Sequence, residues 1–168
     1  SFRDGNVAAM IVSLGEFGII LSLPLWLQGV LGYDALQTGL VLLALAIGSF
    51  VASGFAGAAG GRLSAVMIVR AGLVAEVVGL AGVAIAIGPD SSWLAIVPGL
   101  FVYGFGVGLA TAQLTNVVLR DVPVAMSGQG SGTQSTSRQI GSALGIALLG
   151  TILFTSASGI LDARLAER

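Results

Sequence analysis

Three charged residues, Glu16, Glu76 and Arg138, lie inside long apolar stretches of this sequence. If those stretches are helices, each of the three residues lies about 8–14 residues from the helix end on the same side of the membrane. That is roughly 12–20 Å along an axis that rises about 1.5 Å per residue. A charge at that depth in a membrane costs at least ~2.5–3.5 kcal/mol, so such residues should face a cavity or a partner. One arginine can neutralise at most one of the two carboxylates, and the other should bind a proton.

Each of these charges also has a purely structural interpretation. Arg138 is long enough to reach the membrane interface, and Glu76 could sit protonated or at a poorly packed edge. Glu16 has a shorter side chain than Arg138 and no charged partner three or four residues away. Arg70 lies six residues before Glu76, which is the wrong helical spacing for a neutralising pair.

The longest polar segment covers residues 127–139. As a helix, it places Gln134, Arg138, Gly141 and Gly145 on one stripe, a polar-to-small face suited to a water-lined or interhelical surface. As a loop, it would be a flexible linker, which its Gly and Ser content favours.

Polar side chains near the end of another apolar stretch are candidates for substrate contact. Gln113, Thr115 and Asn116 could hydrogen-bond a substrate, or they could bridge helices at under ~1 kcal/mol each. We assign Gln113, Asn116 and Gln139 to a candidate substrate cavity.

The composition indicates the solvent that surrounds these residues. The 168-residue chain is 55% hydrophobic and only 9% charged, and its mean hydropathy is +1.00, which nearly excludes a soluble domain. It contains no Cys, His or Lys, so we expect no metal, no cofactor and no basic surface for nucleic acid. Without a thiol, an imidazole or paired carboxylates on one helix, we do not expect an enzyme.

Five apolar stretches are each close to the ~20 residues that a helix needs to cross a bilayer. The alternation of period two that a strand would show is missing, and a membrane barrel would need at least about eight strands. We therefore predict an all-α polytopic membrane helix bundle that forms a single domain over residues 1–168. Its predicted spans are at about 6–30, 36–57, 63–88, 93–120 and 131–156.

Two predicted helix starts carry a capping signal. Asp34 with Gln37, and Ser131 with Gln134, have the spacing of a capping box, in which two side chains satisfy the free N–H groups of a first turn.

The links between spans differ in charge. Alternate links carry all the arginines, and the positive-inside rule then places the N-terminus in the cytoplasm. Trp26, Tyr33 and Trp93 would consequently lie together at the outer interface. The basic side holds Arg3, Arg62, Arg70 and Arg120, and the other side holds Asp34 and Asp90.

Small residues recur at four-residue spacing within the predicted spans. Such faces let helix backbones approach closely in a bilayer, where apolar burial gives no driving force. They are Ser49, Ser53 and Gly57 in the second span, Gly104 and Gly108 in the fourth, and Gly141 and Gly145 in the fifth.

Three stretches of the sequence have a pattern that is typical of a known family, and the third is the most specific. They cover residues 23–43, 114–123 and 127–154. In the last, SGQGSGTQSTSRQIGSALGIALLGTILF, small residues surround the pair Arg138-Gln139. Together the strings resemble the carboxyl-terminal half of the fourteen-helix drug:proton antiporters of the major facilitator superfamily.

The sequence departs from that family's pattern in two places. After the second span it keeps only Arg62 of the usual basic residues, and we assign Arg62 to a cytoplasmic loop. Ala44 stands where a proline is frequent, which predicts a straighter helix. The family's half-domain has six helices, so the resemblance implies that the last helix and the amino-terminal half lie outside this chain.

The resemblance implies alternating access, in which two bundles rock about a central cavity. The first and fourth spans would line the cavity, the second and fifth would face the missing half, and the third would be peripheral. That arrangement favours Glu16 over Glu76 as proton carrier, with Arg138 as its partner in proton coupling.

We therefore expect part of a proton-coupled multidrug exporter in a bacterial plasma membrane. Its partners would be the lipid bilayer, the missing segments of the same transporter, protons and a small amphipathic substrate. The alternative is a small non-transporting assembly or regulatory protein that associates through its Gly-rich helix faces.

Overall fold

The computed structural model describes residues 2–59, 63–88 and 92–166, with side chains up to residue 155. All five α-helices of this part are long and apolar enough to cross a membrane, and the described ranges hold no strand. The predicted all-α membrane bundle is confirmed. The elements are α1 (Phe2–Gly29), α2 (Ala35–Ala59), α3 (Ala65–Ala86), α4 (Trp93–Leu119), the 3-10 turn η1 (Val124–Met126) and α5 (Ser127–Ala166).

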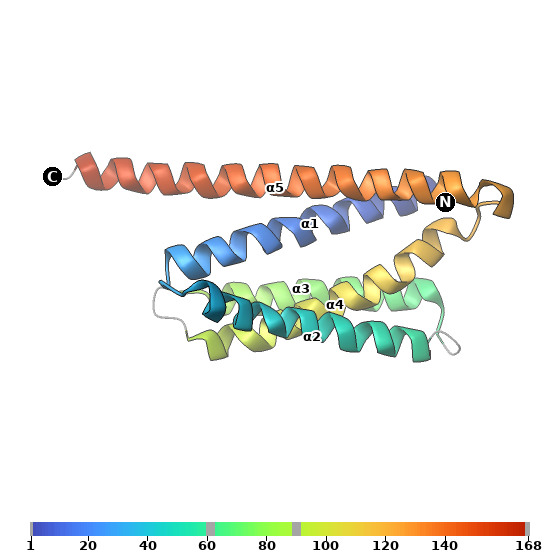
Figure 1. Cartoon of the computed structure of the whole chain (residues 1–168), viewed down its shortest axis with the longest axis horizontal. Helices are drawn as coiled ribbons and strands as arrows, with labels where there is room; N and C mark the ends of the chain where they lie inside the picture. Colours follow the sequence, from blue (N-terminus) through green and yellow to red (C-terminus); the bar gives the residue numbers. More distant parts are fainter. Residues whose placement is uncertain (1, 60–62, 89–91, 167–168) are drawn as a thin grey trace.

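Successive helices run in opposite directions along a common long axis (Figure 1). α4 packs against both α2 and α3, while α1 lies alongside α5 and runs in the same direction. The ends of α1 and α3 and the starts of α2 and α4 are therefore at one end of the molecule, and the starts of α1, α3 and α5 are at the other.

Side-chain caps begin the middle three helices. The predicted box at α2 is confirmed, because the Gln37 N–H donates to Asp34 Oδ1 at 2.7 Å and the Asp34 N–H donates to Gln37 Oε1 at 3.0 Å. The preceding Gly32 has a φ of 68°, which a glycine adopts without strain. Ser64 and Ser92 cap α3 and α4 in the same way, through their side-chain oxygens.

α5 begins earlier than the sequence suggested. It begins at Ser127 directly after η1, so Ser131 and Gln134 lie inside the helix and the predicted capping box there is wrong. The linker interpretation of residues 127–139 is wrong for the same reason. Hydroxyl groups in this Gly- and Ser-rich helix bond to its own backbone: Thr133 Oγ1 donates to the Gln129 carbonyl at 3.0 Å, and Ser137 Oγ donates to the Thr133 carbonyl at 3.0 Å.

One apolar core lies at the end where α1 meets α2. Trp26 and Tyr33 pack against it, and Tyr33 and Trp93 line a neighbouring apolar cavity of about 280 Å³. The three aromatic residues therefore gather at the same end of the bundle, as the span pattern predicts. The buried residues of this core are Leu23, Leu27, Val41, Val83, Ile96 and Leu100.

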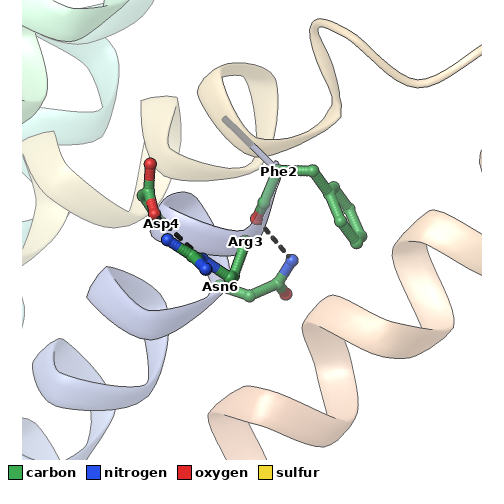
Figure 2. A network of polar contacts seen from close by, with 4 residues as sticks. All are labelled: Phe2, Arg3, Asp4 and Asn6. Carbon is green, nitrogen blue, oxygen red and sulfur yellow. Dashed lines mark hydrogen bonds and ion pairs between the residues drawn. The ribbon is translucent and has the colours of Figure 1, made fainter.

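The start of α1 forms a small polar network (Figure 2). Asn6 is buried, and its Nδ2 donates to the Phe2 carbonyl at 2.9 Å. Arg3 Nε pairs with Asp4 Oδ1 at 3.4 Å, with both side chains exposed. Arg3 thus lies in the first turn of α1, at the end of the bundle where α4 ends.

Glycines make the contacts of α4 with its neighbours very close. A Cβ at Gly104 would collide with the Leu45 carbonyl of α2, and one at Gly108 would collide with the Ser49 carbonyl. Gly48 makes the matching approach from α2, whereas Gly57, which was expected to pack, has nothing within 4 Å of a Cβ position. The glycine of α2 that contacts α4 closely is therefore Gly48, and not Gly57 of the four-residue pattern.

Candidate functional site

The site is centred on an ion pair between the first and last helices. Arg138 Nη2 of α5 lies 3.9 Å from Glu16 Oε2 of α1, and the two side chains are 32% and 18% exposed. That separation exceeds a hydrogen bond, and Glu16 Oε2 is buried without a hydrogen-bond partner among the described residues. The pair is therefore held by electrostatic attraction and not by a hydrogen bond.

Glycines bring α1 and α5 close enough for this pair. A Cβ at Gly141 would collide with the Met10 carbonyl, and one at Gly145 would collide with the Leu14 carbonyl. Gly18 makes the reciprocal approach toward Leu149. Because both helices advance by four residues between successive contacts, the backbones lie parallel along this seam, with Glu16 inside it.

A polar cavity of about 330 Å³ opens beside Arg138, between α1, α4 and α5. Seven of its eight lining residues carry polar side chains, and α1 contributes the aromatic ring of Phe17. Such a wall offers many hydrogen-bond donors and acceptors next to the ion pair. Its lining residues are Phe17, Thr115, Ser131, Gln134, Ser135, Arg138, Gln139 and Ser142.

Two side-chain hydrogen bonds organise this wall. Gln134 is buried, and its Nε2 donates to Thr115 Oγ1 at 3.1 Å, which joins α5 to α4. Gln139 Nε2 donates to Ser135 Oγ at 3.2 Å within α5. The α4–α5 bond therefore closes one side of the cavity.

The residues expected at the substrate cavity divide into two groups. Gln139 lines the cavity. Gln113 instead donates from Nε2 to the Ala56 carbonyl of α2 at 3.4 Å, and Asn116 Nδ2 donates to Gln113 Oε1 at 3.2 Å. Thr115 lies between them in sequence and faces the cavity, because each step along a helix turns the side chain by about 100°.

Glu76, which was expected on a peripheral helix, packs against α4. Its side chain packs over Gly106 of α4, where a Cβ would stand 2.9 Å from Glu76 Cγ. Tyr103, three residues earlier on α4, is buried.

Two further arginines belong to the predicted set. Arg62 lies outside the described residues. Arg70 is exposed on α3, six residues from Glu76. Arg138 is therefore the arginine that pairs with Glu16 among the residues that the structure describes.

The chain matches the sequence profile described as Major Facilitator Superfamily over residues 2–146. It belongs to the major facilitator superfamily. Members of this superfamily are transporters, and this member is a multi-pass membrane protein with efflux proteins of bacteria among its relatives.

Three proteins that are similar in sequence to this major facilitator chain come from species of Mycobacterium and Streptomyces. Multidrug resistance protein Stp of Mycobacterium tuberculosis is 31% identical over 98% of this chain and 31% of its own length. The tetracycline resistance determinant of Streptomyces rimosus is 30% identical over 95% of this chain and 48% of its own length. A probable actinorhodin transporter of Streptomyces coelicolor is 29% identical over 91% of this chain and 27% of its own length.

This chain therefore spans less than half the length of each of these relatives. No solved structure gives a significant match to it.

Proposed function

We propose that this chain forms part of a proton-coupled exporter of small amphipathic compounds that works by alternating access. The relatives named for drug resistance or transport support an export role. The observation that carries the proposal is the Glu16–Arg138 pair beside a polar cavity, inside helices that are apolar enough to cross a membrane.

The pair offers a simple coupling device. With Glu16 ionised, its charge balances that of Arg138 and can also attract a cationic substrate. With Glu16 protonated, that attraction is gone, so proton and substrate exclude each other at this residue. Movement of the cavity from one side of the membrane to the other then exchanges a proton for a substrate.

The outward faces of α2 and α5 support a second bundle as partner. Leu40 and Phe50 of α2 are 61% and 83% exposed, and Ile140 and Leu148 of α5 are also exposed. In the proposed transporter these apolar faces would contact lipid or the amino-terminal half.

The alternative of a non-transporting assembly protein has less support. It requires free Gly-rich faces, and a Cβ at Gly141 or Gly145 would collide with α1, while one at Gly104 or Gly108 would collide with α2. The faces that would join two copies are already used inside one chain.

We further propose a bacterial plasma membrane location with the N-terminus in the cytoplasm. The start of α1 with Arg3 and the end of α4 next to Arg120 lie at the same end of the bundle, and Asp34 lies at the opposite end. The positive-inside rule supports the cytoplasmic placement of the arginine-bearing end.

The test is a substitution of Glu16 in the complete transporter. Reconstituted vesicles with an imposed proton gradient would be assayed for transport of a lipophilic cation. Glu16→Gln should lower gradient-driven transport by at least about tenfold while probe binding persists, and Glu16→Asp should retain part of the rate. A Glu16→Gln protein that transports at the wild-type rate would contradict the proposal.

A further inference from the structure

A second cavity lies between α1 and α5, below the glycines that bring these helices together. Gly141 meets the Met10 carbonyl, and one turn earlier on each helix the residues are Ser137 and Asn6. Both of these residues line a cavity of about 300 Å³ near the end of the bundle where α1 and α5 begin. We call it the Asn6 cavity.

Asn6 places an unpaired oxygen in this cavity. Its side chain is only 8% exposed, and its Nδ2 donates to the Phe2 carbonyl at 2.9 Å. Its Oδ1 is buried and has no hydrogen-bond partner among the described residues. Figure 2 shows the Asn6 side chain and the Phe2 ring extending from α1 toward α5, whereas Arg3 and Asp4 are directed toward each other. A buried amide oxygen without a donor is unfavourable, so a ligand that donates to it would be stabilised.

Two hydroxyl oxygens of α5 line the same cavity. Thr133 Oγ1 donates to the Gln129 carbonyl at 3.0 Å, and Ser137 Oγ donates to the Thr133 carbonyl at 3.0 Å. A hydroxyl group has one hydrogen, so both oxygens keep only lone pairs for a ligand. Asn6 Oδ1 and these two hydroxyl oxygens therefore give the cavity three acceptors, and its ligand must be a donor.

The other lining residues are apolar, except for one arginine. Phe2, Val7 and Met10 form the apolar part of the wall. Arg3 is 89% exposed and lies 3.4 Å from Asp4 Oδ1, so its charge is balanced by a carboxylate and screened by water. The cavity thus combines apolar surface with hydrogen-bond acceptors.

We propose that the Asn6 cavity binds the primary ammonium group of an amphipathic amine, which donates to Asn6 Oδ1, Thr133 Oγ1 and Ser137 Oγ. A primary ammonium has three donors and no acceptor, which matches three acceptors. An alcohol has one donor, and a quaternary ammonium has none. A charged donor also forms stronger hydrogen bonds than a neutral one.

This inference rests on the proposed function, because it names a contact that an exported amine makes before it reaches the cavity beside Arg138. Ser137 directly precedes Arg138, so the two side chains lie about 100° apart around α5. The two cavities therefore open on neighbouring faces of one helical turn. In the proposed orientation the Asn6 cavity is at the cytoplasmic end, where a substrate enters.

Two cations of equal charge test whether donors are recognised. 1-Adamantylammonium has three N–H groups, and 1-adamantyltrimethylammonium has the same apolar body and none. Their binding to the purified complete transporter in nanodiscs would be measured by equilibrium dialysis, with Glu16→Gln present to remove the carboxylate that attracts cations to the other cavity. We expect the primary ammonium to bind at least about tenfold more tightly. Equal affinities would overturn the inference.

Thr133→Val and Thr136→Val form a matched pair in the same background. Both threonines donate to the carbonyl four residues earlier, at 3.0 and 2.9 Å, but of the two only Thr133 lines the cavity. Thr133→Val should weaken binding of the primary ammonium by at least about threefold, and Thr136→Val should leave it unchanged. Equal effects of the two substitutions would overturn the inference.

Substitutions of Asn6 give the sharpest contrast. Asn6→Leu removes the unpaired oxygen and should weaken binding of the primary ammonium by at least about tenfold, without changing that of the trimethyl analogue. Asn6→Asp keeps an acceptor and adds a negative charge, so it should bind the primary ammonium at least as tightly as Asn6 does, which keeps the test decisive if Asn6→Leu does not fold. Unchanged affinity in Asn6→Leu, or weaker binding in Asn6→Asp, would show that the cavity holds only water.

The two proposals fail in different ways. If Glu16→Gln transports at the wild-type rate, the proposed function is wrong, whatever the Asn6 variants bind. If Glu16→Gln loses proton-driven transport while Asn6→Leu keeps its affinity for the primary ammonium, the proposed function stands and the Asn6 site is wrong.

Discussion

Gly145 of α5 lies directly against the carbonyl of Leu14 in α1, two residues before the carboxyl group that Arg138 reaches. The site therefore depends on a glycine seam as much as on its charged residues. A side chain larger than hydrogen at this seam must move α5 away from α1, and the ion pair would lengthen with it.

Gly145→Ala should destabilise the transporter by about 1–3 kcal/mol, because the new methyl group overlaps a backbone carbonyl rather than a flexible side chain. Gly132→Ala is the matched control on the same helix, since a Cβ there has nothing within 4 Å. It should be neutral or should stabilise by up to about 1 kcal/mol. Thermal unfolding in detergent would compare the two variants. Equal unfolding midpoints would contradict the prediction that α5 packs closely on α1 at Gly145.

The hydrogen bond from Gln134 to Thr115 should contribute measurable coupling between α5 and α4. A double-mutant cycle with Gln134→Ala and Thr115→Val should give an interaction energy of about 0.5–1.5 kcal/mol, as for buried polar pairs between membrane helices. The Gln139–Ser135 pair lies within α5 and is exposed, so its cycle should give a value near zero. Equal energies for both pairs would show that the first does not join the helices.

The capping box at the start of α2 should stabilise the bundle locally. Asp34→Ala removes the oxygen that accepts the Gln37 N–H, and it should cost about 0.5–2 kcal/mol. Asp34→Asn keeps an acceptor at the same position and should cost much less. The measurement is unfolding of each variant in detergent, and identical losses for Ala and Asn would show that the cap contributes nothing.

The proposed orientation is open to a clean labelling test, because the chain contains no cysteine. Single cysteines at Asp34 and Arg120 would be exposed to a membrane-impermeant thiol reagent in intact cells. We expect labelling at position 34 and none at position 120 until the cells are opened. The reverse pattern would overturn the orientation.

This chain alone should not transport. Its α2 and α5 expose apolar faces, and the cavity beside Arg138 is walled by α1, α4 and α5 only. Purified chain reconstituted into vesicles should therefore show no proton-gradient-dependent movement of a lipophilic cation, whereas the complete transporter should. Efflux by the chain alone would contradict the need for a second bundle.

Several features of the fold follow from the sequence because they are local. A helix that crosses a bilayer must satisfy its own backbone within about 20 apolar residues, so the number of spans is visible in composition and length. The Asp34–Gln37 cap depends on a spacing of three residues, and it forms as expected. The depth of Glu16, Glu76 and Arg138 also follows from counting along each helix.

The tertiary structure decided which of these residues meet. Arg138 and Glu16 are 122 positions apart, and whether Arg138 pairs with Glu16 or Glu76 depends on how each helix is rotated about its axis. Close approach at Gly141 and Gly145 sets that rotation, and the same spacing at Gly57 leads to no contact. A bilayer accepts any apolar face equally, so the choice of partner face depends on the fit of one backbone against another.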